Sequence, residues 1–167
     1  GTLATDSKAV AYNLQTAEKT FATFAVSVSN PGGHSSRPRK DNAIYQLAAD
    51  MQKFASYEFP VQYSEQTLAS FKFTGQQIGG ELGAAMQRFA DNPKDATAAA
   101  IIAADPEYVG TLRTTCVATM LSGGHAENAL PQLATATINC RIFPGVSVES
   151  VRLKIAEVIA DSGATVK

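Results

Sequence analysis

Residues 134–143 alternate strictly between two kinds of side chain, and this pattern constrains the fold more than any other feature. One face is apolar and the other is largely polar: Ala134, Ala136, Ile138, Cys140 and Ile142 against Thr135, Thr137, Asn139, Arg141 and Phe143. A period of two residues is typical of a β-strand that is buried on one side. We therefore expect a sheet with one covered face and one open face.

Other strands follow from the same kind of pattern. Residues 19–30 place Phe24, Val26 and Val28 on one side, with small or polar residues on the other. Residues 114–122 form another strand-like run, and proline and glycine residues end these segments. We expect residues 164–167 to open one more strand.

Two helices are expected between these strands. The first has Asp41 as its N-cap, runs to about Tyr57, and carries one apolar stripe: Ile44, Leu47, Ala48, Met51, Phe54 and Ala55. The second has Ser147 as its N-cap and Gly163 as its stop signal, with four apolar residues inside: Val151, Ile155, Val158 and Ile159.

Residues 61–110 differ from the rest of the chain. Leu82, Ala85, Met86 and Phe89 are spaced as on a helix, and residues 96–104 are rich in alanine. Because strands resume only afterwards, we interpret residues 61–110 as a mostly helical insertion. Residues 1–18 show no sustained period and are expected to lead into a domain formed by residues 19–167.

The order of these elements predicts the fold class. Strand, helix, helical insertion, strand, strand, helix and strand indicate an α+β protein. The expected fold is a ferredoxin-like βαββαβ two-layer sandwich, with the helical insertion between the first helix and the second strand.

The composition is that of an ordinary globular protein. Of 167 residues, 45% are hydrophobic and 17% are charged, with a formal net charge of −1. We expect no nucleic-acid partner, since there is no basic stripe, and no membrane partner, since no apolar run reaches the roughly 18 residues that cross a bilayer. The N-terminus lacks the regions of a signal peptide, but Gly1 in place of Met suggests trimming, so the sequence does not decide the cellular compartment.

Cys116 and Cys140 lie in strand-like runs, where a free cysteine packs as a small hydrophobe. A disulfide between them is possible but not indicated.

Three polar residues are candidates for binding a small molecule. His34 follows two glycines that permit a tight turn, so its imidazole is expected at an exposed corner. Arg141 lies on the open face of its strand, where a guanidinium can pair bidentately with a carboxylate. Asn128, just before that strand, can donate and accept hydrogen bonds. Each residue also has an ordinary structural interpretation: a solvated loop histidine, a surface arginine and a turn asparagine.

The sequence contains no complete active site. A zinc site needs three or four ligands at workable spacing, and the two histidines and two cysteines do not provide it. No nucleophile elbow and no phosphate-binding loop is present. We expect no metal ligands in this chain and no catalysis by the chain alone.

Several motifs together resemble the lid, or dimerisation, domain of the zinc aminoacylase/carboxypeptidase family (peptidase family M20). They are Gly33-His34-Ser35-Ser36-Arg37-Pro38 with Asn42-Ala43-Ile44, Glu127-Asn128-Ala129-Leu130-Pro131, Arg141-Ile142-Phe143-Pro144-Gly145 and Ser147-Val148-Glu149-Ser150-Val151. Leu112-Arg113-Thr114-Thr115, Thr119-Met120-Leu121 and the long helical insertion are most similar to the carboxypeptidase S branch. The similarity covers about residues 19–167.

This resemblance implies a function. Family members cleave peptide or N-acyl amino acid amide bonds, with zinc ions held in a catalytic domain that this chain lacks. Their lid domains pair to form a homodimer. The resemblance assigns His34 to the scissile carbonyl oxygen in the partner subunit's active site, and Asn128 and Arg141 to the substrate, with the arginine on its free carboxylate. We thus expect the groups of His34 and Arg141 to converge on one bound molecule. His125 matches no role in the family.

A second hypothesis is a free-standing ferredoxin-like regulatory module that binds a small anion or amino acid. The fold itself is shared by many functions, so it does not separate the two hypotheses. The sequence surrounding this segment in its gene would distinguish them.

Overall fold

The computed structural model of the protein describes residues 19–167. The predicted leading segment, residues 1–18, lies outside the described residues. The described chain is a mixed α+β structure with a four-stranded antiparallel sheet and six helices. None of these helices is long and apolar enough to cross a bilayer.

The four-stranded sheet is built around two long central strands. β1 (Thr20–Ser29) pairs with β5 (Leu133–Ile142) along its whole length, and β3 (Thr115–Gly123) and β6 (Ala164–Val166) form the edges. The order across the sheet is β3-β5-β1-β6, and every pairing is antiparallel. The central strands therefore come from segments more than 100 residues apart in the sequence.

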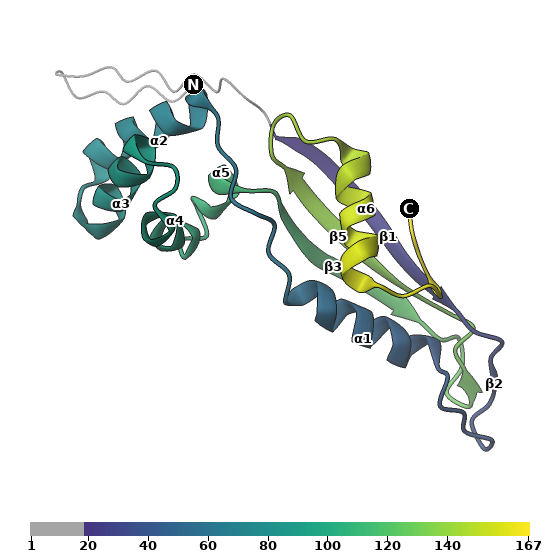
Figure 1. Ribbon diagram of the computed structural model, residues 1–167. Helices are drawn as coiled ribbons and strands as arrows, with labels where there is room; N and C mark the ends of the chain where they lie inside the picture. Colours follow the sequence, from purple (N-terminus) through teal and green to yellow (C-terminus); the bar gives the residue numbers. More distant parts are fainter. Residues whose placement is uncertain (1–18) are drawn as a thin grey trace, which may run out of the picture.

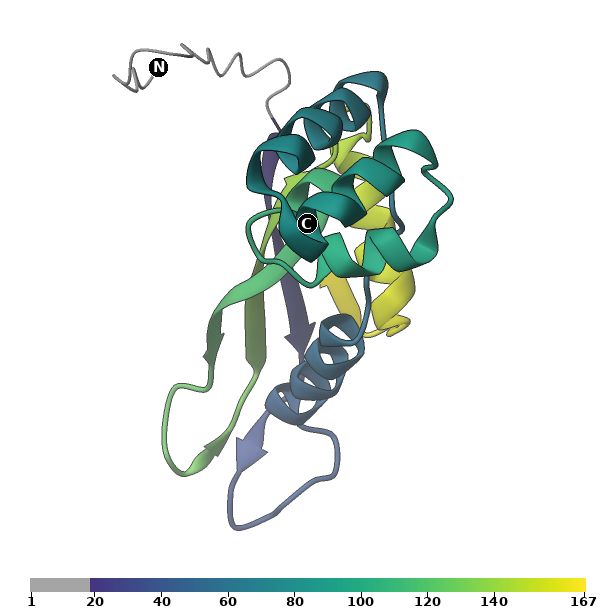
Figure 2. The ribbon, with the colours of Figure 1, turned by 90° about the vertical axis from the view of Figure 1, so that its left-hand side faces the viewer.

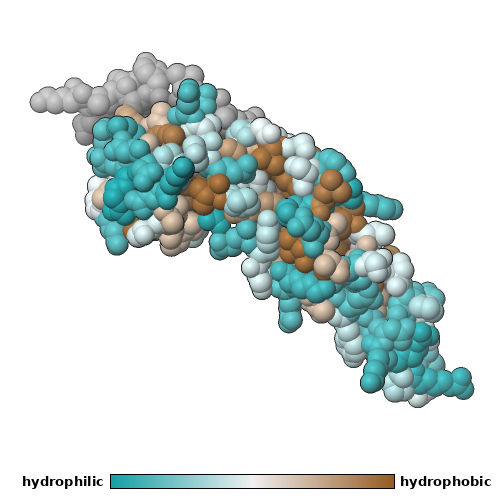
Figure 3. Space-filling view, viewed as in Figure 1, coloured by the Kyte–Doolittle hydropathy of each residue, from teal (hydrophilic) through white to brown (hydrophobic). Residues whose placement is uncertain are grey.

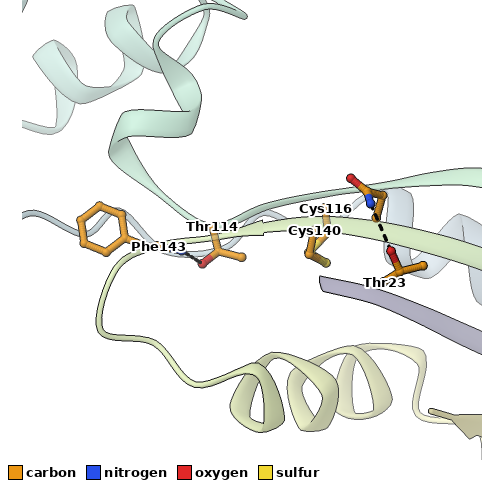
Figure 4. The surroundings of a disulfide bond; sticks show 6 residues. Thr23, Thr114, Cys116, Cys140 and Phe143 are labelled. Carbon is orange, nitrogen blue, oxygen red and sulfur yellow. Dashed lines mark hydrogen bonds between the residues drawn. A yellow bond between two sulfur atoms is a disulfide. The ribbon is translucent and has the colours of Figure 1, made fainter. Parts of the chain in front are cut away.

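The alternation in β5 is confirmed by its burial. Ala134, Ala136, Ile138, Cys140 and Ile142 are all buried, whereas the residues between them stay accessible. The prediction is wrong at Phe143, because the strand ends at Ile142 and the Phe143 side chain turns into the interior. Its N–H donates a hydrogen bond of 2.9 Å to Oγ1 of Thr114, which is shown in Figure 4.

Two helices cover the buried face of the sheet (Figure 1). α1 spans Ala43–Ala55 and α6 spans Val148–Ile159, and both contribute to one apolar core with β1 and β5. Apolar burial of this kind contributes roughly 25 cal/mol per Å² and holds the two layers together. Within residues 19–167, no helix lies over the opposite face of the sheet.

The predicted helix boundaries need two corrections. Asn42 caps α1 instead of Asp41, accepting hydrogen bonds from the backbone N–H groups of Ile44 and Tyr45. The carboxylate of Asp41 pairs with Arg39 instead. α6 ends before Gly163, because Ala160 already adopts the left-handed conformation that ends the helix.

The segment between α1 and β3 holds four helices with a core of their own. They are α2 (Glu65–Ile78), α3 (Gly80–Asp91), α4 (Ala96–Ala103) and α5 (Val109–Leu112), which gather at one end of the sheet (Figure 2). Their buried side chains include Phe71, Met86, Phe89, Ile102 and Leu112. The helical character expected for residues 61–110 is therefore present, and its core is separate from that of the sheet.

A disulfide joins β3 to β5. Cys116 lies directly opposite Cys140 in the strand register, and the structure links their sulfur atoms (Figure 4). The sequence alone did not decide whether this disulfide forms, because the pairing depends on the register of two strands and not on the spacing of the cysteines. Neither cysteine is free.

Candidate functional site

A small two-stranded ribbon forms the tip of the molecule beyond the sheet. β2 (Gly33–His34) pairs with β4 (Ala129–Leu130), with His34 opposite Ala129. The turn into β2 requires Gly32, whose φ is 76° and whose Cβ, if present, would lie 2.7 Å from the side chain of Gln132. The glycine corner expected from the sequence thus has a steric reason.

The ribbon brings His34 and Asn128 together. The backbone N–H of Ser35 donates a hydrogen bond of 2.9 Å to the carbonyl oxygen of Asn128. Both His34 and Asn128 are exposed, and Figure 3 shows that the tip around them is hydrophilic. We name this pair, with the ribbon that holds it, the tip.

The imidazole of His34 is oriented by its own loop. Its Nδ1 accepts the backbone N–H of Ser36 at 3.2 Å and lies 2.8 Å from the Ser36 hydroxyl oxygen. Because Nδ1 acts as an acceptor, the neutral ring carries its proton on Nε2. Nε2–H is then the group with which the tip can donate a hydrogen bond to an oxygen atom.

Arg141 lies near the far end of β5 and is exposed on the open face, as predicted. It is opposite Phe21 on β1, and its Cζ atom lies 4.8 Å from the centre of the Phe21 ring. A guanidinium above an aromatic face gains a cation–π attraction and keeps its donor edge free. On the same face, the Asn139 side chain donates a hydrogen bond of 3.3 Å to Thr23 (Figure 4).

The structure does not bring Arg141 to His34 and Asn128. The tip adjoins the Leu133 end of β5, whereas Arg141 is eight residues further along, about 27 Å at the usual rise of a strand. The expectation that His34 and Arg141 converge on one molecule is therefore not met within a single chain. His34 and Asn128 meet at one end of the sheet, and Arg141 lies at the other.

Lys19 is a neighbour of Arg141 that the sequence analysis missed. Its ammonium donates a hydrogen bond of 2.9 Å to the carbonyl oxygen of Arg113. Burial, and secondly the charge of Arg141, lower the pKa of Lys19 to about 8. The sequence pattern did not indicate this neighbour, because Lys19 comes just before β1 and only the β1–β5 register places Arg141 at that end of the sheet.

The edge strand β3 carries exposed apolar side chains. Val117, Met120 and Leu121 are 60%, 67% and 71% exposed, respectively, and the outer edge of β3 has no strand beside it within residues 19–167. On the helix side of β3, the apolar stripe of α1 adjoins Leu121, because Ile44 is exposed and a groove of about 260 Å³ lies between them. Val117 and Met120 are opposite Asn139 and Thr137 and therefore project from the open face. We name these residues, Ile44, Val117, Met120 and Leu121, the β3 edge surface.

The remaining histidine lies in a hollow beside the tip. A wide cavity of about 750 Å³ is lined by Ser35, Tyr45, His125 and Glu127, among others. No group of three or more His, Cys, Asp or Glu side chains in residues 19–167 is placed to hold a metal ion. The described residues therefore do not fit a zinc site.

Comparison with known families identifies the chain. Residues 16–166 match the peptidase dimerisation domain of the M20 peptidases. The chain belongs to this family. Curated relatives of this dimerisation domain include human "N-fatty-acyl-amino acid synthase/hydrolase PM20D1", 27% identical over 87% of the chain and 29% of that protein. "Probable carboxypeptidase S-like 2" of Dictyostelium discoideum is 29% identical over 86% of the chain and 27% of that protein.

The dimerisation domain thus spans less than a third of the length of these curated relatives. Among solved structures, a metallo-carboxypeptidase of Sulfolobus solfataricus matches with a TM-score of 0.52 at 12% identity, over 89% of this chain and 42% of that one. Human carnosine dipeptidase 1 matches with a TM-score of 0.51 at 14% identity, over 90% and 36%. At these identities the structures show a shared fold.

Proposed function

We propose that this dimerisation domain is the substrate-binding lid of a homodimeric zinc-dependent metallopeptidase or amidohydrolase. The enzyme cleaves peptide or N-acyl amino acid amide bonds, and the lid alone is inactive. The observation that carries this proposal is the placement of His34 and Asn128 at one end of the sheet and Arg141 at the other. His34 and Arg141 cannot reach one substrate within a single chain, but they can do so when two chains pair in an antiparallel arrangement.

The β3 edge surface supports such a pairing. β3 starts at Thr115, opposite Arg141, and ends at Gly123, close to the tip. A two-fold axis beside β3 would place two copies of this strand antiparallel and extend the sheet across the dimer. The tip of each chain would then lie toward the Arg141 end of its partner. The exposed apolar residues of β3 and α1 would be covered at the same time.

The three site residues have complementary roles in this arrangement. His34 donates its Nε2–H to the scissile carbonyl oxygen, where an oriented donor stabilises the developing oxyanion, worth about 3–4 kcal/mol at such sites. Arg141 binds the free carboxylate of the substrate, and Asn128 hydrogen-bonds the same molecule beside His34. Zinc, its ligands and the general base belong to the catalytic domain of the parent enzyme. Closure of the lid completes the site and excludes water.

The fold and domain assignment are part of this proposal. We infer a ferredoxin-like βαββαβ sandwich for the sheet, α1 and α6, supported by the strand order β3-β5-β1-β6 and by two helices on one face. The helices between α1 and β3 form an insertion into it, supported by their separate core. The family match favours a lid over a free-standing regulatory module.

The role of Arg141 can be tested with paired substrates. In the full-length enzyme, Arg141→Ala should lower kcat/KM for substrates with a free carboxylate by about 10- to 100-fold, the range for a lost charge-assisted hydrogen bond. Esterified substrates, which lack that charge, should lose much less. Equal losses on both substrates would remove the role given to Arg141.

A further inference from the structure

The loop between β3 and β4 carries a histidine and a carboxylate that the proposed site does not use. His125 and Glu127 are both exposed, and they line the cavity of about 750 Å³ beside the tip together with Ile44 and Tyr45 at the start of α1. Within residues 19–167, neither His125 nor Glu127 forms an ion pair. The loop therefore presents two ionisable side chains to this cavity.

Another charged pair lies at the opposite end of β3. Glu58, which follows α1, is 81% exposed and accepts a hydrogen bond of 2.6 Å from the guanidinium of Arg113, two residues before β3. Tyr57 and Phe59 flank Glu58, and their rings meet edge to face with centres 5.1 Å apart. Residues 57–59 thus present one carboxylate between two aromatic side chains.

A two-fold axis beside β3 brings these two sets of residues together. β3 runs from Thr115 to Gly123, so a pairing centred on its middle residue, Thr119, places Thr115 opposite Gly123 of the partner subunit. Two residues further out, Arg113 comes opposite the partner's His125. Glu58, which is hydrogen-bonded to Arg113, then faces the same loop of the partner.

The direction of α1 leads to the same contact. α1 lies alongside β3, because both line the apolar groove between them (Figure 1). The axis that pairs two copies of β3 therefore places two copies of α1 antiparallel. The last turn of α1, at Ala55, then adjoins the first turn of the partner's α1, where Ile44 and Tyr45 border the cavity beside the tip. Residues 57–59 follow directly after that last turn.

We propose that residues 57–59 of one subunit occupy the cavity beside the tip of the other subunit. The carboxylate of Glu58 accepts a hydrogen bond from the imidazole of the partner's His125, as a charged acceptor of the stronger kind. Arg113 lies between Glu58 and the partner's Glu127 and offsets the repulsion of the two carboxylates. The two-fold axis makes this contact twice in each dimer. The inference rests on the homodimer of the proposed function.

This contact gives the inserted helices a role in the composite site. Residues 57–59 connect α1 to α2 and form the base of the insertion. By holding the partner's loop, they position the partner's tip, which carries His34, toward the Arg141 end of this chain. Glu58 and His125 are then positioning residues, since they touch neither the substrate nor the metal.

Paired cysteines test the contact directly. Within one chain, Glu58 and His125 lie near opposite ends of α1, whose 13 residues span about 20 Å, so a disulfide between these positions forms only between two subunits. The chain with Glu58→Cys and His125→Cys should give a covalent dimer after mild oxidation, seen on a non-reducing gel. Neither single variant should do so, nor should Lys94→Cys combined with His125→Cys, because Lys94 is exposed elsewhere on the inserted helices.

A double-mutant cycle tests the hydrogen bond. Glu58→Ala and His125→Ala should each raise the Kd of the dimer about tenfold in sedimentation equilibrium, because each removes both copies of the contact. The double variant should be no weaker than either single variant. Losses that multiply in the double variant would mean that the two side chains do not touch, and would overturn the proposed hydrogen bond.

The outcomes separate this contact from the proposed function. A dimer in which Glu58→Cys and His125→Cys form no cross-link would overturn the contact and leave the function standing, because two copies of β3 can pair in another register. A monomeric wild-type chain would overturn both the contact and the homodimer. If the cross-link forms but the full-length enzyme hydrolyses neither peptides nor N-acyl amino acids, the contact stands and the proposed function fails.

Discussion

Asp50 provides a sharp test of the packing between the two layers. Its side chain is on α1 and only 2% exposed, and Oδ2 has no hydrogen-bond partner among the described residues. Oδ1 lies 3.4 Å from the Lys53 ammonium, and the carboxylate of Asp161, after α6, faces the same position. Burial, together with the negative charge of Asp161, raises the pKa of Asp50 to about 6.

The sign of the pH effect follows from this shift. In the unfolded chain an aspartate has a pKa near 3.9, so the folded state binds the proton more tightly. Asp50 therefore favours the folded state most at acidic pH, and this contribution is lost as the pH rises from about 4 through about 6. A difference of two pKa units corresponds to about 3 kcal/mol, and we expect about 2 kcal/mol because Asp50 and Asp161 titrate together.

Asp50→Asn should remove the loss of stability that ionisation of Asp50 causes as the pH rises. The amide is neutral at every pH and can donate to Asp161, as the protonated acid does. The weak contact to half-exposed Lys53 is lost, which costs at most about 1 kcal/mol. We therefore expect the variant to be more stable than the wild type at pH 7 by about 1–2 kcal/mol, and to lose the decline in stability between pH 4 and 7 that Asp50 causes.

Urea unfolding at pH 5 and pH 7 measures this directly. A matched control is Asp91→Asn, which changes an exposed carboxylate paired with Lys72 and should alter the free energy of unfolding by less than about 0.5 kcal/mol. A variant Asp50→Asn that is less stable at pH 7, or that keeps the pH dependence of the wild type, would refute the reasoning.

Two other perturbations test the sheet and its edge. Reduction of the Cys116–Cys140 disulfide, which closes a loop of 24 residues, should lower the free energy of unfolding by about 3 kcal/mol. Urea unfolding with and without reductant measures this, and coincident curves would show that the bond does not form. Leu121→Lys places a charge on the β3 edge surface and should convert the dimer to a monomer in light scattering, whereas Lys94→Glu, an exposed change among the inserted helices, should not. A dimer that survives Leu121→Lys would locate the interface elsewhere.

The faces of the strands could be predicted from the sequence because they depend only on local alternation. Ala134 and Ile138 alternate with Thr135 and Thr137, and no tertiary contact changes which side they occupy. The helix cap was less predictable. Asp41 and Asn42 are adjacent and equally suited to cap α1, and the ion pair of Arg39 with Asp41 leaves Asn42 as the cap.

The arrangement of the site depends on register, which the sequence does not contain. His34 lies beside Asn128 because β2 pairs with β4 across 94 residues of chain. The Arg141 guanidinium lies over the Phe21 ring because the two residues are opposite in the β1–β5 ladder. The residue types indicated a binding site, but only the strand pairings show that its parts lie at opposite ends of one sheet.

Subunit mixing in the full-length enzyme tests the central claim, that each active site takes His34 from one chain and Arg141 from the other. One chain carries His34→Ala and its partner carries Arg141→Ala, so each homodimer has a defect in both of its sites. In the mixed dimer, one site would be wild type and the other doubly defective, and we predict recovery of about half the wild-type activity. If both residues served the same chain's site, each site of the mixed dimer would keep one defect. Activity no higher than the average of the two mutant homodimers would therefore contradict the account.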